Sequence, residues 1–122
     1  VVSREEILAA QRDYVNVYVS DDILRYIVSI VEKTRKHNDV HLGVSPRGSQ
    51  ALLRASQVYA ILRGRDYVIP DDVKAMAKPV LRHRMILRNV MAAKGGQQDE
   101  IIAQILRQVP VPTEERLWER EG

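Results

Sequence analysis

The chain has 122 residues, a formal net charge of +3 and a pI near 9.4, and 45% of its residues are hydrophobic. Length and composition fit one soluble domain, and no run approaches the ~20 apolar residues of a membrane span. The chain contains no cysteine, which excludes a disulfide framework and a thiolate metal site. Basic residues are interspersed with acids, so the diffuse positive charge argues against a nucleic-acid-binding stripe.

Two features of the bulk sequence indicate fold class and compartment. Phenylalanine is absent, so the core must consist of Ile, Leu, Val, Ala and Met, a composition that suits helices packed on helices. The first residues, VVSREE, lack the basic segment and apolar run of a signal peptide, which favours a cytoplasmic protein. Because the chain starts without methionine and goes straight into a helix signal, we expect it to be a piece of a longer protein.

The first predicted helix begins with a capping box. The Ser3 hydroxyl and the Glu6 carboxylate can each satisfy a backbone N–H of the first turn, and the helix should run to about Asp13. Residues 14–19, YVNVYV, place valine at every second position. This alternation predicts a short strand.

The next two helices carry their own start signals. Ser20, followed by two aspartates, predicts a helix that ends near His37 and is followed by a loop. Ser45 with Pro46 predicts a third helix, which Gly64 ends. We expect the buried face of this third helix to consist of Ala51, Leu52, Ala55, Val58, Tyr59 and Leu62.

The second half of the chain completes the expected bundle. Residues 65–69, RDYVI, predict a second short strand, which we expect to pair with residues 14–19. Pro70 with two aspartates opens a fourth helix, which Pro79 should kink or end, after which the apolar spacing continues. A last helix is expected over residues 99–109. The predicted fold is all-α, a small helical bundle with a minor two-stranded β element.

Arg47 does not fit the charge pattern of the other predicted helix starts. It lies in the first turn of the third helix, where a cation opposes the helix dipole at a cost of about 0.3–1 kcal/mol. Either its side chain points into water, or it marks an anion site, since helix-start N–H groups and a guanidinium fork both suit a phosphate. Helical spacing places Arg47 on one polar stripe with Gln50, Arg54 and Gln57. This stripe indicates a polar, negatively charged partner but does not identify it.

Known nucleotide-binding loops are missing from the chain. There is no GxxxxGK[ST] phosphate loop and no GxGxxG turn. A single arginine cannot hold a nucleotide by itself. If Arg47 contacts a phosphate, the rest of the site must lie on other polypeptide.

Three motifs follow one another along the chain: SPRG at 45–48, GRDYVIPDDV at 64–73 and LRHR at 81–84. In this order they resemble the C-terminal lid domain of the MoxR family of AAA+ ATPases, with SPRG resembling the sensor-2 motif. The flanking segments VSREEILAAQRDYVNVYVSDDILRYIVSIVEKTR and IIAQILRQVPVP are also similar to the family. The resemblance implies an AAA+ helical lid over residues 1–112 and leaves a polar tail, 113–122, without a match.

The resemblance also implies a role for each residue at the third helix start. Arg47 would be the sensor-2 arginine, which reaches the γ-phosphate of ATP and takes part in catalysis. Ser45 and Pro46 would set the helix start beside the nucleotide, and Gln50 and Arg54 would line the same nucleotide-binding stripe. ATP and Mg²⁺ would be bound mainly by a missing core domain with the Walker motifs, so this chain alone should not hydrolyse ATP.

Partners are implied in the same way. Family members assemble into rings, typically hexamers, in which the lid packs on its own AAA+ core. They act as chaperone-like machines on client proteins, often ones with von Willebrand factor A domains. No membrane partner is expected, and the interspersed acids argue against a nucleic-acid partner.

The sequence leaves other candidate sites and functions open. His37, Asp39 and His41 could suggest a metal, but a loop turn is the better interpretation without a third strong ligand on a rigid element. Arg82 and Arg84 form either a solvated basic face or, by resemblance, a contact with the core or a neighbouring subunit. The alternatives to a lid are a free-standing basic helical module that binds nucleic acid and a module that recruits a client protein.

Overall fold

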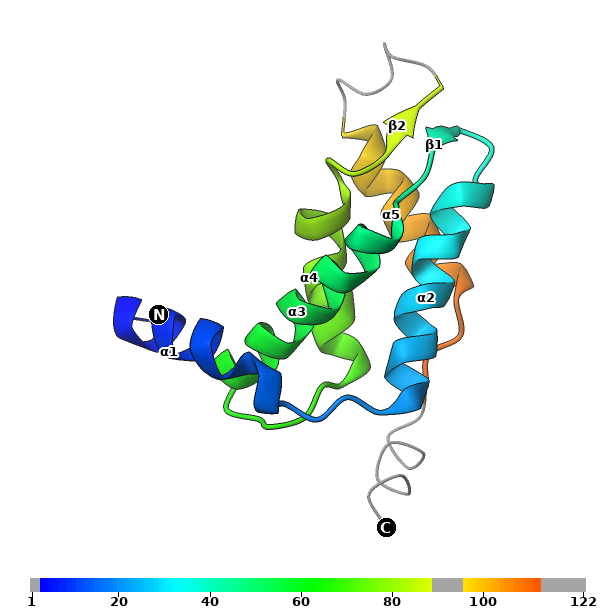
Figure 1. Ribbon diagram of the computed structural model, residues 1–122. Helices are drawn as coiled ribbons and strands as arrows, with labels where there is room; N and C mark the ends of the chain where they lie inside the picture. The colour runs from blue at the N-terminus through cyan, green and yellow to red at the C-terminus, as the bar shows by residue number, and fades with distance from the viewer. Residues whose placement is uncertain (1–2, 89–95, 113–122) are drawn as a thin grey trace.

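The computed structural model describes residues 3–88 and 96–112, a bundle of five α-helices with a small two-stranded sheet at one end (Figure 1). The predicted fold class is confirmed. No helix within those two ranges is long and apolar enough to cross a bilayer. The tail, 113–122, lies outside the described residues. The elements are α1 Arg4–Asp13, a 3-10 turn η1 Tyr14–Asn16, α2 Asp21–Lys36, β1 Val40–Leu42, α3 Pro46–Leu62, α4 Pro70–Leu81, β2 Ile86–Leu87 and α5 Gln97–Gln108.

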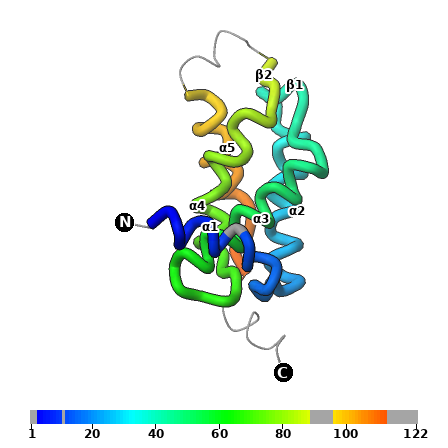
Figure 2. The backbone as a smooth tube through the Cα atoms, turned by 60° about the vertical axis from the view of Figure 1, so that its left-hand side comes forward, coloured from blue at the N-terminus to red at the C-terminus, as the bar shows by residue number. Residues whose placement is uncertain are grey.

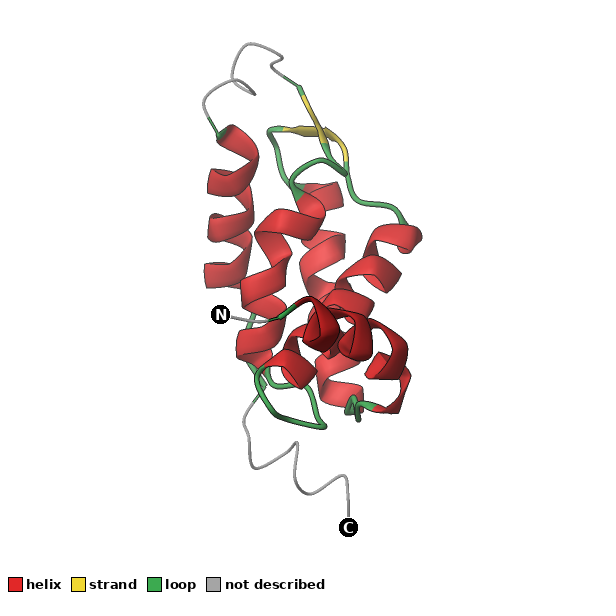
Figure 3. Ribbon diagram, turned by 90° about the vertical axis from the view of Figure 1, so that its left-hand side faces the viewer, coloured by secondary structure: helices red, strands yellow, loops and turns green. Residues whose placement is uncertain are grey.

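α3 and α4 form the centre of the bundle and run in opposite directions (Figure 1). α2 and α5 pack beside them, while α1 and η1 pack against α3 (Figure 2). The sheet lies at the end of the bundle where α3 begins, as the yellow strands of Figure 3 show. α4 begins at the opposite end, so the two helix starts are separated by the length of the bundle.

Helix starts and ends follow the sequence signals closely. The capping box of α1 is confirmed, with the Glu6 N–H donating to the Ser3 hydroxyl at 3.1 Å and the Ser3 N–H to the Glu6 carboxylate at 3.2 Å. The Ser20 hydroxyl likewise accepts from the backbone N–H of Ile23 at 3.2 Å. Gly64, with φ of +81°, ends α3 in the left-handed conformation. Pro79 lies inside α4, which ends two residues later.

The two predicted strands are wrong. Residues 14–16 form η1, and residues 65–69 form a loop that meets the first segment at a single parallel bridge between Tyr18 and Tyr67. Val15, which the alternation treated as part of a strand, is 66% exposed. The segments therefore do lie together, but by one bridge and without a ladder.

The actual sheet uses segments that the sequence did not predict as strands. β1 lies in the predicted loop after α2, and β2 lies in the apolar run after Pro79. They pair antiparallel, with Val40 opposite Leu87 and Leu42 opposite Ile86, and with an irregularity between the two pairs. Strands of three and two residues are too short for periodicity to reveal.

The buried face of α3 is rotated from the predicted one. Leu52 is buried as expected, but Gln57, assigned to the polar stripe, is also buried, and its side-chain amide donates to the Val17 carbonyl at 3.1 Å. The other five predicted residues of this face are only half-buried. The hydrophobic core consists of Val17, Ile23, Tyr26, Ile27, Ile30, Val31, Val40, Val44, Leu52, Ala60, Val68, Val73, Ala77, Leu81, Met85, Leu87, Ile101, Ile102, Ile105 and Val109.

Candidate functional site at the start of α3

The segment that leads into α3 is fastened to α2. Val44 is fully buried, and its N–H donates to the Thr34 hydroxyl at 3.0 Å while its carbonyl accepts from Arg35 Nε at 2.9 Å. Gly43 lies so close to α2 that a Cβ there would be 2.7 Å from the Arg35 Cα atom. These contacts, which we call the Val44 clamp, fix the position of the α3 start.

The first turn of α3 is left open. Ser45 has the extended conformation of a capping residue, but its hydroxyl accepts no capping hydrogen bond, and Pro46 follows at the first helical position. The Gly48 N–H donates to the Ser45 carbonyl at 2.9 Å. The turn contains no acid, whereas the other four α-helices of the described ranges have acidic residues in their first turns. The positive end of the α3 dipole therefore keeps its field.

The predicted site residues fall together on one exposed edge of α3. Ser45, Pro46, Arg47, Gln50 and Arg54 are all exposed. Within the described part of the chain, the Arg47 side chain has no ion pair and no hydrogen bond. Because Gln57 is buried, the exposed polar stripe ends at Arg54.

Gly48 is required by its neighbours. The residue is buried, and a Cβ there would lie 2.1 Å from Val44 Cγ1 and 3.5 Å from Arg84 Cδ. The missing side chain lets Val44 pack beneath the first turn, and the Arg84 stem lies at ordinary contact distance from the same position. The sequence showed a small residue here but not these two contacts.

Arg82 and Arg84 have different roles. Arg82 makes a two-pronged contact with the Asp99 carboxylate, at 2.9 and 3.1 Å, that joins the end of α4 to the start of α5. Its guanidinium therefore has a structural partner inside the bundle. Arg84 is exposed, and its Nε donates to the Val80 carbonyl at 3.1 Å.

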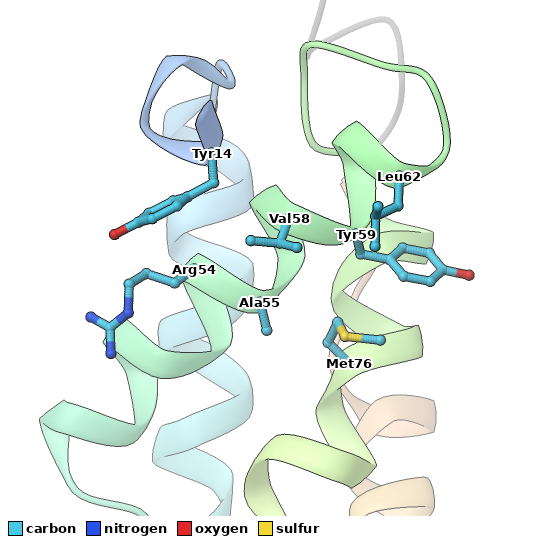
Figure 4. A pocket seen from close by; sticks show the side chains of 7 residues that line it. All are labelled: Tyr14, Arg54, Ala55, Val58, Tyr59, Leu62 and Met76. Carbon is cyan, nitrogen blue, oxygen red and sulfur yellow. The ribbon is translucent and has the colours of Figure 1, made fainter. Parts of the chain in front are cut away.

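An apolar groove of about 470 Å³ continues the exposed edge of α3 beyond Arg54 (Figure 4). Ala55 and Val58 project from α3 between Tyr14 and Met76. Most of this groove consists of residues that the sequence predicted to be buried. Its lining is Tyr14, Arg54, Ala55, Val58, Tyr59, Leu62 and Met76.

The buried carboxylate at the start of α4 is fully partnered. The buried Asp72 carboxylate accepts two hydrogen bonds of 2.6 Å from the Arg65 guanidinium and one of 2.8 Å from the Ile69 N–H. The hydrogen bond with Asp72 raises the pKa of Arg65, which is charged at every working pH. The sequence suggested only a helix-end charge for Arg65, because a contact across seven residues leaves no local signal.

The possible metal cluster has a structural explanation. His37 Nε2 is hydrogen-bonded to the Gln104 side chain at 3.0 Å, and its Nδ1 accepts from the Asp39 N–H at 3.1 Å. In the described ranges no three metal-binding side chains come together. His37 thus joins the end of α2 to α5.

Comparisons with known proteins agree on one family. A family model described as an AAA lid domain matches residues 32–105. The uncharacterized protein YeaC of Bacillus subtilis is 47% identical over 93% of this chain and 36% of its own length. Chaperone MoxR1 of Mycobacterium tuberculosis is 35% identical over 92% of this chain and 32% of its own length.

A solved structure shares the fold. A crystal structure from Cytophaga hutchinsonii, named as a candidate ATPase, matches with a TM-score of 0.75 and 32% identity over 84% of this chain and 34% of that one. The chain therefore spans about a third of the length of these relatives.

Proposed function

This chain belongs to the AAA lid domain family, as a lid of the MoxR type, and on that premise we propose that Arg47 is the sensor-2 arginine, which contacts the γ-phosphate of ATP. The nucleotide and its Mg²⁺ would be held mainly by an ATPase core outside this chain. The observation that carries the proposal is the open first turn of α3, with an exposed, unpaired arginine on a backbone fastened by the Val44 clamp.

The residues present fit a phosphate. The first turn of α3 offers the Arg47 backbone N–H, a positive dipole end and a guanidinium, with no acid in that turn to repel an anion. A charge-assisted hydrogen bond to the terminal phosphate exists only while ATP is intact. Hydrolysis removes that contact and hence the free-energy difference that holds the lid closed. Ser45 and Pro46 set the helix start, and Gln50 and Arg54 extend the polar edge.

The wider activity extends the proposal to the whole protein. The lid would comprise residues 1–112, and the protein would act in the cytoplasm as a ring, typically a hexamer, that couples ATP hydrolysis to remodelling of client proteins. Client proteins with von Willebrand factor A domains are the expected class. The name of the relative Chaperone MoxR1 supports a chaperone-like role.

The test uses the full-length protein with its ATPase core. Arg47→Ala should lower ATP turnover by about 10- to 100-fold, the value of one charge-assisted hydrogen bond of about 1.5–3 kcal/mol. Arg107→Ala, which removes an exposed arginine of α5, is the matched control and should leave turnover unchanged. Equal turnover in the two variants, with melting temperatures unchanged, would contradict the role of Arg47.

A further inference from the structure

A second arginine lies on the first turn of α3 although it comes from the segment after α4. The Arg84 Cδ atom is 3.5 Å from the position that a Gly48 Cβ would occupy, so its stem packs against the residue that follows Arg47 in the first turn. Any larger residue at 48 would meet Val44 first, at 2.1 Å. The chain therefore brings two cationic side chains to a single turn.

The head of Arg84 is oriented but not neutralised. Its Nε donates to the Val80 carbonyl at 3.1 Å, which uses one of the five guanidinium N–H groups. The side chain is exposed, and it makes no ion pair within residues 3–88 and 96–112. Arg82, two residues earlier, is by contrast bound at both prongs by Asp99.

Two cations beside a helix start, without an acid in that turn, repel each other and oppose the dipole. An anion with more than one negative charge relieves both effects at once. The terminal phosphate of a nucleoside triphosphate has this charge, and its oxygens match two guanidinium forks.

We propose that Arg84 is a second phosphate-contacting arginine, which binds the terminal phosphate of ATP together with Arg47. The inference rests on the proposed function, because the nucleotide comes from the core domain. It assigns a specificity role: the arginine pair distinguishes a triphosphate from a diphosphate, since the diphosphate lacks the group that both side chains contact.

The experiment measures nucleotide affinity in the full-length protein, by fluorescence titration with labelled ATP and labelled ADP. Arg84→Met is the main variant because it removes the charge and keeps an unbranched stem over Gly48. It should weaken ATP binding at least about tenfold and change ADP binding less than about twofold. Arg84→Lys, which keeps the charge but loses the planar fork, should fall between Arg84→Met and the parent protein.

Arg88→Ala is the matched control. Like Arg84, Arg88 is exposed and donates through Nε to a backbone carbonyl. Its acceptor is the Asn38 carbonyl, at 2.9 Å, in the loop between α2 and β1. Its removal should leave both affinities unchanged. The loss in the Arg47→Ala, Arg84→Met double variant should be smaller than the product of the single losses, because the two residues share one ligand.

The outcomes separate the two proposals. If Arg47→Ala cripples turnover while Arg84→Met binds ATP like the Arg88→Ala control, the role of Arg84 is overturned and that of Arg47 stands. If Arg84→Met weakens ATP and ADP equally, the contact is not with the terminal phosphate and the inference is again overturned. Unchanged turnover in Arg47→Ala would overturn the proposed function itself.

Discussion

The starts of α3 and α4 use the same backbone plan with opposite charges. Each has an extended capping residue followed by proline at the first helical position, Ser45-Pro46 in one and Ile69-Pro70 in the other. At α4 the next two residues are aspartates, and Asp72 binds both the Ile69 N–H and Arg65. At α3 they are Arg47 and glycine.

The difference separates architecture from function. At the α4 start the buried charge of Asp72 is neutralised by Arg65 within the chain. At the α3 start the charge has the sign that weakens the helix, and no residue of the described ranges compensates it. A helix start that is left unfavourable while its backbone is firmly held is what the proposed phosphate contact requires.

The largest expected effect comes from removing the Asp72–Arg65 ion pair at the α4 start. Asp72→Asn leaves the Arg65 guanidinium, whose side chain is 20% exposed, without its counter-charge, and should lower the free energy of unfolding by about 3 kcal/mol. Urea unfolding measures this as a lower midpoint at constant slope. Asp99→Asn is the control: that pair is about 38% exposed on both sides and should cost less than about 1 kcal/mol. Equal losses of unfolding free energy in the two variants would show that the ion pair at the α4 start is no more stabilising than an exposed pair.

Gly43→Ala tests the Val44 clamp at the α3 start. The added Cβ would lie 2.7 Å from the Arg35 Cα atom and 2.8 Å from its nitrogen, and these backbone atoms cannot turn aside. We expect a loss of about 1–3 kcal/mol in urea unfolding, as in overpacked cores. A tolerated alanine would mean that the α3 start is not fastened to α2 and that its open turn is merely mobile.

Arg47→Asp places an acid in the first turn of α3, as at the α4 start. Replacing a cation by an acid in the first turn should raise stability by about 0.3–1 kcal/mol at low salt while abolishing the proposed ATP contact. The gain should shrink in high salt, because the charge is exposed. A variant that lost stability would show that Arg47 has a structural role in this chain.

The smallest expected effect concerns Tyr26 of α2, which feels the charge of Asp71 at the α4 start. Its side chain is buried, and its hydroxyl has no hydrogen-bond partner within the described ranges. Burial, and then the Asp71 charge, raises its pKa above the ordinary value of 10.0. The unfolded chain therefore loses this proton first, and stability should fall as pH rises past about 10.

Tyr26→Phe isolates this effect. At pH 7 the variant should differ from the parent chain by less than about 0.5 kcal/mol, since no hydrogen bond is lost. Between pH 9 and 11 its urea midpoint should fall less than that of the parent. Parallel midpoints across this range would contradict the raised pKa.

Local signals in the sequence predicted the helices well. The Ser3–Glu6 box, the Ser20 cap and Pro46 each lie within four residues of the backbone groups they organise, so spacing alone located them. The exposed edge of α3 followed from the same helical spacing, up to Arg54.

Features that depend on distant contacts were missed. Gln57 is buried because it bonds to the Val17 carbonyl forty residues away, and Thr34 supports the α3 start through Val44, ten residues on. The strands pair residues more than forty positions apart and are too short to show alternation. The place of Arg84 beside Gly48 depends on the antiparallel course of α3 and α4.

The Val44 clamp has a consequence for binding strength. Both backbone polar groups of Val44 are already bonded to α2, so the main chain at the α3 start is ordered before any anion arrives. Binding of the proposed phosphate would then restrict the rotamers of the arginine side chains alone, and little conformational entropy would be lost. The same residues in a free peptide would have to order every backbone torsion and would hold the anion far more weakly.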